Sequence, residues 1–73
     1  MADIPVRSEV TGVVARVAAV VGGRVAEGDE IIIVEAMKME LPVLAPASGI
    51  VAAILVAEGE MVSEGQAIAT LSR

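Results

Sequence analysis

The sequence predicts an all-β domain, a small two-sheet sandwich or flattened barrel with approximate twofold symmetry. Three observations predict this class: the chain of 73 residues is rich in Val, Ala and Ile, its glycines recur at short intervals, and it repeats itself at an offset of 37 residues. Helices of ordinary length do not fit between turn residues spaced so closely. A single domain over residues 1–73 is the organisation that this length allows.

The repeat aligns residues 3–35 with residues 40–72 without a gap. Ten of the 33 aligned pairs are identical, and four of these ten are glycines or prolines, such as Gly28 over Gly65. Because these residues fix backbone geometry, the two halves share their turns as well as their hydrophobic pattern. Neither half can bury its apolar face alone, so we expect them to stack around a core of Val, Ile, Leu and Ala.

Within each half, β-branched runs alternate with turn residues. We expect strands that include residues 13–17, 31–34 and 50–51. A Gly-x-x-Val-x-x-Gly frame at residues 22–28, and again at 59–65, predicts a short strand between two turns. Residues 52–57 alone could form a helix, but a gapless repeat assigns them to a strand, because their counterparts contain a charge and run into glycines. Two prolines, Pro5 and Pro42, predict edge strands or strand starts.

Composition excludes several classes of function. The chain has no Cys, no His and no aromatic residue, so the common zinc sites and the Cys-His or Ser-His-Asp nucleophiles cannot form. A net charge of -5 without stacking side chains is unsuited to nucleic acid. The carboxylates gather at predicted turns as a solvated acidic surface, so we expect no catalytic residue and no metal ligand.

Location follows from the apolar runs. The longest, residues 50–57, is far shorter than the roughly 20 residues that span a membrane, and the N-terminus does not resemble a signal peptide. We therefore expect a cytoplasmic protein that has no membrane partner.

Residues 36–39, Ala-Met-Lys-Met, lie between the two repeats and predict a tight turn that joins them. The turn carries Lys38, the only lysine of the chain, and a lysine at a turn tip displays its amine to solvent. A single lysine is ordinarily a solvated surface charge. Met37 and Met39 argue for more, because large apolar side chains at an exposed tip are unfavourable unless a partner binds them.

The hexapeptide at residues 35–40, Glu-Ala-Met-Lys-Met-Glu, resembles the attachment motif of biotinyl carrier domains, the family that includes the biotin carboxyl carrier protein of acetyl-CoA carboxylase. Residues 45–49, Ala-Pro-Ala-Ser-Gly, and the frame at 59–65 resemble the second half of that family. The resemblance implies two four-stranded antiparallel sheets with the modified lysine at the tip of the connecting hairpin. It also implies a set of residues that the ligase and the carboxylase recognise: Glu35, Ala36, Met37 and Met39.

The implied function is that of a biotin carboxyl carrier, which is not itself an enzyme. A biotin protein ligase attaches biotin to Lys38 as an amide, and a biotin carboxylase then carboxylates the attached ring. A carboxyltransferase passes the carboxyl group to an acceptor such as an acyl-CoA. The domain itself contributes a tether that keeps the intermediate concentrated between the two sites.

The resemblance is not complete. Ser8 and Glu9 stand where many relatives have a proline, which predicts a looser start to the strand that follows. The gapless repeat leaves no room for the protruding thumb of some acetyl-CoA carboxylase carriers. The predicted sandwich begins within about three residues of Met1 and ends at Arg73, which leaves no Pro/Ala-rich linker, so we expect either a stand-alone carrier or an excised fragment.

Two other functions stay open. One is a lipoyl carrier, whose lysine usually stands in a sequence such as Asp-Lys-Ala, unlike the methionines here. The other is an unmodified interaction module whose apolar tip docks a partner.

Overall fold

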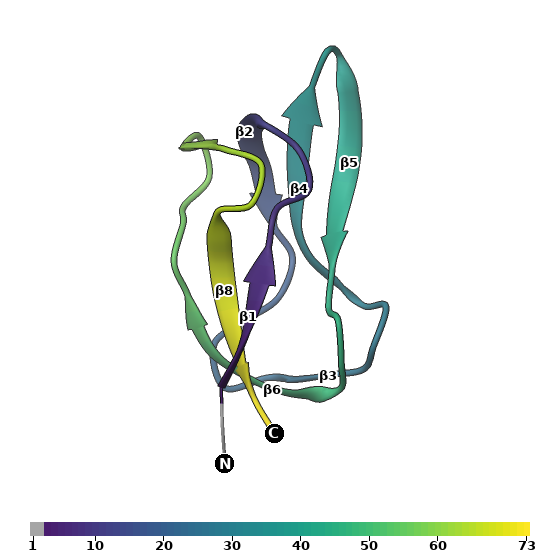
Figure 1. The fold of residues 1–73 in the computed structure, drawn as a ribbon, viewed down its shortest axis with the longest axis vertical. Coiled ribbons are helices and arrows are strands. Elements are labelled where there is room, and N and C mark those ends of the chain that lie inside the picture. The colour runs from purple at the N-terminus through teal and green to yellow at the C-terminus, as the bar shows by residue number, and fades with distance from the viewer. Residues whose placement is uncertain (1–2) are drawn as a thin grey trace.

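A computed structural model describes residues 3–73, which form eight β-strands and no helix (Figure 1). Two four-stranded antiparallel sheets face each other as an open sandwich, not a closed barrel. The first sheet has the order β1-β8-β6-β3 and the second β5-β4-β2-β7. The strands are β1 (Asp3–Arg7), β2 (Gly12–Val17), β3 (Arg24–Val25), β4 (Glu30–Ala36), β5 (Met39–Leu44), β6 (Gly49–Ile54), β7 (Met61–Val62) and β8 (Ala67–Ser72).

The 37-residue repeat is confirmed in the strands, but the two halves interleave rather than forming one sheet each. β2, β3 and β4 begin 37 residues before β6, β7 and β8. Each sheet takes two strands from each half, because β1 pairs with β8 and β5 pairs with β4. Neither half can therefore complete a sheet without the other.

The core lies between the inner faces of the two sheets and is wholly aliphatic. Repeat-related residues such as Val14 and Val51, or Ile31 and Ile68, are at most 1% exposed. Burying each such side chain contributes about 1.5–3 kcal/mol. The predicted core of Val, Ile, Leu and Ala is confirmed, and Ile4, Val17 and Ile54 pack against it from the margins.

Edge strands carry the two prolines at matching positions. Pro5 lies in β1 and Pro42 in β5, and each of these strands is the outermost of its sheet. A proline cannot donate to a further strand, so both edges are protected from pairing with another chain. The edge position predicted for these prolines is confirmed.

Hydrogen bonds at Ser8 hold the segment after β1, where the missing proline predicted a looser start. Ser8 is 1% exposed, and its hydroxyl donates to the carbonyl oxygen of Val10 (2.6 Å) and accepts from its N–H (3.3 Å). The Ser8 N–H donates to the carbonyl oxygen of Gln66 (2.9 Å), and its carbonyl oxygen accepts from Gly65 (2.7 Å). The Ser8 hydroxyl thus holds the backbone locally by hydrogen bonds, so a proline ring is not needed at this place.

Turns at residues 26–29 and 63–66 join each short strand to the next long one. In both, the fourth N–H donates to the first carbonyl oxygen at 3.0 Å. The side chain of the fourth residue accepts from the first N–H, at 2.8 Å and 2.9 Å. Gly28 and Gly65 are the third residues, with φ of 91° and 85°, as a type II turn requires.

Replacing either turn glycine with valine is expected to lower the free energy of unfolding by about 1–3 kcal/mol, because valine is strained at positive φ. Nothing lies within 4 Å of a Cβ built on Gly28 or Gly65, so strain and not a clash causes the loss. Gly28→Asn, which tolerates positive φ, is expected to cost less than Gly28→Val. Thermal unfolding followed by far-ultraviolet circular dichroism measures both, and equal stability of the Asn and Val variants would contradict the assignment.

Candidate functional site

The predicted attachment residues lie together at the end of the β4–β5 hairpin. Figure 1 shows this hairpin extending past the rest of the molecule. β2 pairs with β4 only as far as Val13 opposite Glu35, so the last pair of the hairpin, Ala36 opposite Met39, continues beyond the sheet. The structure thus brings together all five residues that the sequence singled out, from Glu35 to Met39.

A two-residue turn of Met37 and Lys38 closes the hairpin. Both residues have positive φ, 52° and 65°, and two such residues between antiparallel strands make a type I′ turn. This turn matches the right-handed twist of the strands, and the pairing of β4 with β5 next to the turn is regular from Val34 opposite Leu41 to Ala36 opposite Met39. The tight turn predicted between the repeats is confirmed.

Neither side chain suits that backbone. Type I′ turns prefer Asn-Gly, and a non-glycine residue in the left-handed region costs about 1 kcal/mol or more. The turn is held in this form because the pairing of Val34 with Leu41 and of Glu35 with Glu40 fixes its two ends. The sequence therefore keeps Met37 and Lys38 at a position where both lower the stability of the fold.

The turn side chains are open to solvent. Met37 is 93% exposed and Met39 is 56% exposed, while Lys38 is also an exposed residue. Within residues 3–73 the one ion pair joins Arg16 to Glu30 at 3.9 Å, so it does not engage the Lys38 amine. The amine is accessible for acylation, which is what a covalently carried group requires.

Behind the turn, two carboxylates face each other across the strands. Glu35 and Glu40 are directly opposite and both are exposed. Like charges in this arrangement destabilise a sheet by a few tenths of a kcal/mol to about 1 kcal/mol. Side chains alternate along a strand, so Ala36 and Met39 point to the opposite face of the hairpin. The tip therefore has an acidic face and an apolar face.

The row that contains these carboxylates continues across the sheet. Val13 lies opposite Glu35, and Met61 lies opposite Val13, so the two apolar side chains share the face of the carboxylates. Val13 is 37% exposed and Met61 is 67% exposed. No motif of the sequence points to either residue. The repeat aligns Met61 with Arg24, and this difference is the sequence signal that distinguishes Met61.

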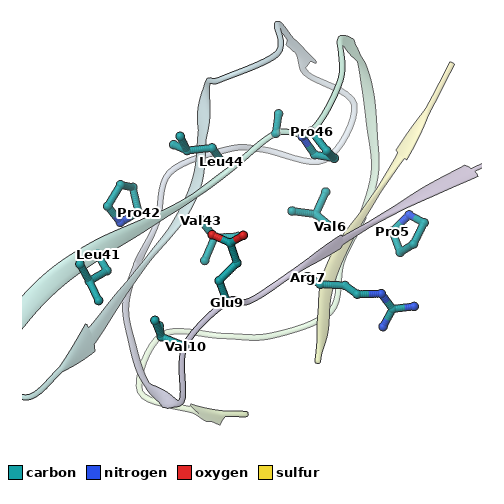
Figure 2. A pocket seen from close by; sticks show the side chains of 11 residues that line it. Pro5, Val6, Arg7, Glu9, Val10, Leu41, Pro42, Val43, Leu44 and Pro46 are labelled. Carbon is teal, nitrogen blue, oxygen red and sulfur yellow. The ribbon is translucent and has the colours of Figure 1, made fainter. Parts of the chain in front are cut away.

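A groove of about 560 Å³ lies between the edge strands β1 and β5. Figure 2 shows the Glu9 carboxylate near its middle, with Val6, Val43 and Leu44 around it. None of the predicted attachment residues lines this groove. Among residues 3–73 no three His, Cys, Asp or Glu side chains are grouped so as to hold a metal ion, and no helix is long and apolar enough to cross a membrane.

Comparison with known proteins identifies the family. The sequence model of the biotin/lipoyl family, described as "Biotin-requiring enzyme", matches residues 5–71. The chain therefore belongs to the family of biotin/lipoyl attachment domains. Among curated proteins no sequence matches the chain significantly.

Solved structures show the same fold within much longer carboxylases. The urea carboxylase of Kluyveromyces lactis matches 99% of this chain with 40% identity and a TM-score of 0.93. A single-chain, multi-domain long-chain acyl-CoA carboxylase matches 97% with 28% identity and a TM-score of 0.88. The matched region is 6% of the first chain and 7% of the second, so this chain corresponds to a small part of either protein.

The strain at the turn makes a prediction about stability. Replacing Met37 and Lys38 together by Asn-Gly is expected to raise the free energy of unfolding by about 1–2 kcal/mol, because both residues then tolerate positive φ. The gain should appear as a higher midpoint in urea unfolding followed by circular dichroism. A variant that is no more stable than the natural chain would show that the turn is not strained.

Proposed function

We propose that this chain is a biotin carboxyl carrier in which Lys38 holds biotin as an amide. The observation that carries the proposal is an exposed lysine amine at the protruding type I′ turn, between two exposed methionines. A tether needs its acceptor on a rigid, accessible support, and the paired strands β4 and β5 provide that support. The family membership, shown over residues 5–71, is consistent with this role.

The chemistry at Lys38 is acylation of an amine. The Lys38 ammonium first gives up one proton, and the free amine then attacks the activated carboxyl carbon of biotin; the activating group leaves that carbon, and Nζ gives up a second proton as the amide forms. The amide is neutral, so Lys38 loses its charge. Attached biotin would supply a ureido nitrogen that accepts a carboxyl group from a biotin carboxylase and gives it up to a carboxyltransferase.

The residues of the tip position and present the acceptor. The lysine stem adds four flexible methylenes to a fixed Cα, so the carried group can swing while staying at high effective concentration. Met37 and Met39 offer apolar, adaptable contacts to the ligase and the carboxylase. Ala36 is small enough to sit half-buried opposite Met39, and Glu35 gives the approaching enzyme a charge to recognise.

Biotin is favoured over lipoate for two reasons. The lysine stands between methionines, unlike the Asp-Lys-Ala type of sequence usual in lipoyl domains. In addition, the two similar solved structures are both carboxylases. They support a biotin carboxylase and a carboxyltransferase as partners, and urea or an acyl-CoA are the acceptors that their names suggest. The cytoplasmic location stays a prediction.

Intact mass of the chain purified from its native cell tests the attachment. We expect the mass increase of one biotin on the natural chain and none on Lys38→Arg, which keeps the charge but not an amine that the ligase accepts. Lys38→Arg should also lose all binding to streptavidin while unfolding at the same temperature. A lipoate increase, or an unmodified chain in cells with an active ligase, would overturn the proposal.

The recognition role of the methionines makes a further prediction. Met37→Ser is expected to slow biotinylation by a purified ligase by about tenfold, since an exposed anchor residue is worth about 1–2 kcal/mol to binding. The side chain is 93% exposed and contributes little packing, so the unfolding temperature should hardly change. An unchanged rate of biotinylation would remove Met37 from the recognised residues.

A further inference from the structure

Four exposed side chains form a row across the outer face of the second sheet, directly behind the attachment turn. Glu40 pairs with Glu35, Glu35 with Val13 and Val13 with Met61. Residues directly opposite in antiparallel strands point to one face, and neighbouring strands are about 4.8 Å apart, so the row spans about 14 Å. We call these four residues the outer row. Its apolar half is open to solvent, with Met61 67% exposed.

The internal repeat supplies a comparison for this surface within the same molecule. The equivalent row of the first sheet has the same pairings, and its members are Asp3, Ser72, Ile50 and Arg24. Arg24 stands where the outer row has Met61, and both are in two-residue edge strands. The fold therefore accommodates a charged residue at this position. The exposed methionine of the second sheet is therefore not needed for structure.

Met61 and Val13 are neighbours in the outer row, so together they expose an apolar surface beside the turn. A partner that covers this surface carries apolar groups there. Basic groups on the partner are complementary to Glu35 and Glu40, which face each other and take no part in the one ion pair within residues 3–73. The chain as a whole has a net charge of -5, which adds to the attraction of a basic surface.

We propose that the outer row is the surface on which the biotin carboxylase docks while it carboxylates the group on Lys38. This inference rests on the proposed function. The row is continuous with the turn, so an enzyme that encloses the end of the hairpin approaches the row as well. The partner surface combines an apolar patch for Met61 and Val13 with Lys or Arg side chains for the two glutamates. Such a small contact suits a carrier that must leave after each turnover.

Exchanging the repeat-related residues tests the proposal. The chain is prepared as the natural sequence, Met61→Arg, Met61→Ser and Arg24→Met, all biotinylated to completion as verified by intact mass. Each is titrated as the substrate of a purified biotin carboxylase. Met61→Arg is expected to raise the KM for the carrier about tenfold with kcat unchanged, because docking weakens but the reacting group does not change. Met61→Ser, which adds no charge, is expected to raise KM in the same direction.

Arg24→Met is the matched control and is expected to leave KM unchanged. Met61→Arg should fold, since arginine occupies the equivalent place in β3, and circular dichroism verifies this. An unchanged KM for both Met61 variants, or an equal rise for Arg24→Met, would overturn the inference alone. If the Met61 variants are biotinylated more slowly but keep the KM for the carboxylase, the outer row is a surface for the ligase, and the inference is overturned as well. A natural chain that takes up no biotin would contradict the proposed function as well.

Discussion

The pairing of strands from different halves of the chain is the interaction on which the rest of the structure depends. β5 adds to β4, and β1 adds to β8, so each sheet is completed by the other half. The aliphatic inner faces can then cover each other, and strands as short as β3 and β7 suffice to finish the sheets. Because the pairing of β4 with β5 keeps one register from Ile32 opposite Val43 to Ala36 opposite Met39, it also builds the support for Lys38.

The same pairing separates the two ends of the molecule. The molecule is 36 Å long, and the hairpin turn that contains Lys38 lies at one of its ends. β8 and β1 are the counterparts of β4 and β5 in the repeat. They meet at the other end of the molecule, where Asp3 lies opposite Ser72 and no turn joins the two strands (Figure 1). One end thus carries Lys38, the proposed acceptor, and the other end carries the open ends of β1 and β8. A group attached to Lys38 lies far from the ends of the described chain, where it can swing without meeting them.

Much of this was readable in the sequence, and the limits have physical reasons. The 37-residue offset predicted equivalent strands and turns, because glycines such as Gly28 and Gly65 report backbone geometry directly. It could not reveal which half a strand pairs with, since the exchange of β1 and β5 leaves the hydrophobic pattern unchanged. Nor could it predict positive φ at Met37 and Lys38, because propensity argues against that conformation and only the pairing of the flanking strands imposes it.

The surroundings of two side chains, Ser8 and Met61, could not be predicted from the sequence either. The hydrogen bonds of the Ser8 hydroxyl depend on where the chain turns after β1, which no local pattern encodes. The exposure of Met61 depends on β7 being an edge strand, so hydrophobicity alone would have assigned it to the core.

The twofold repeat also separates what the fold needs from what the function needs. Positions that must be alike for the sandwich to form are alike in both halves, as in the turns at residues 26–29 and 63–66. Two features of the second sheet have no counterpart in the first sheet: the strained turn of Met37 and Lys38, and the exposed Met61, which stands where the repeat has Arg24. A fold that tolerates Arg24 at the matching place has no internal cause to keep that methionine. The second sheet thus combines Lys38 with an exposed apolar side chain that the fold does not require, and this is the surface on which we propose that the partner enzyme docks.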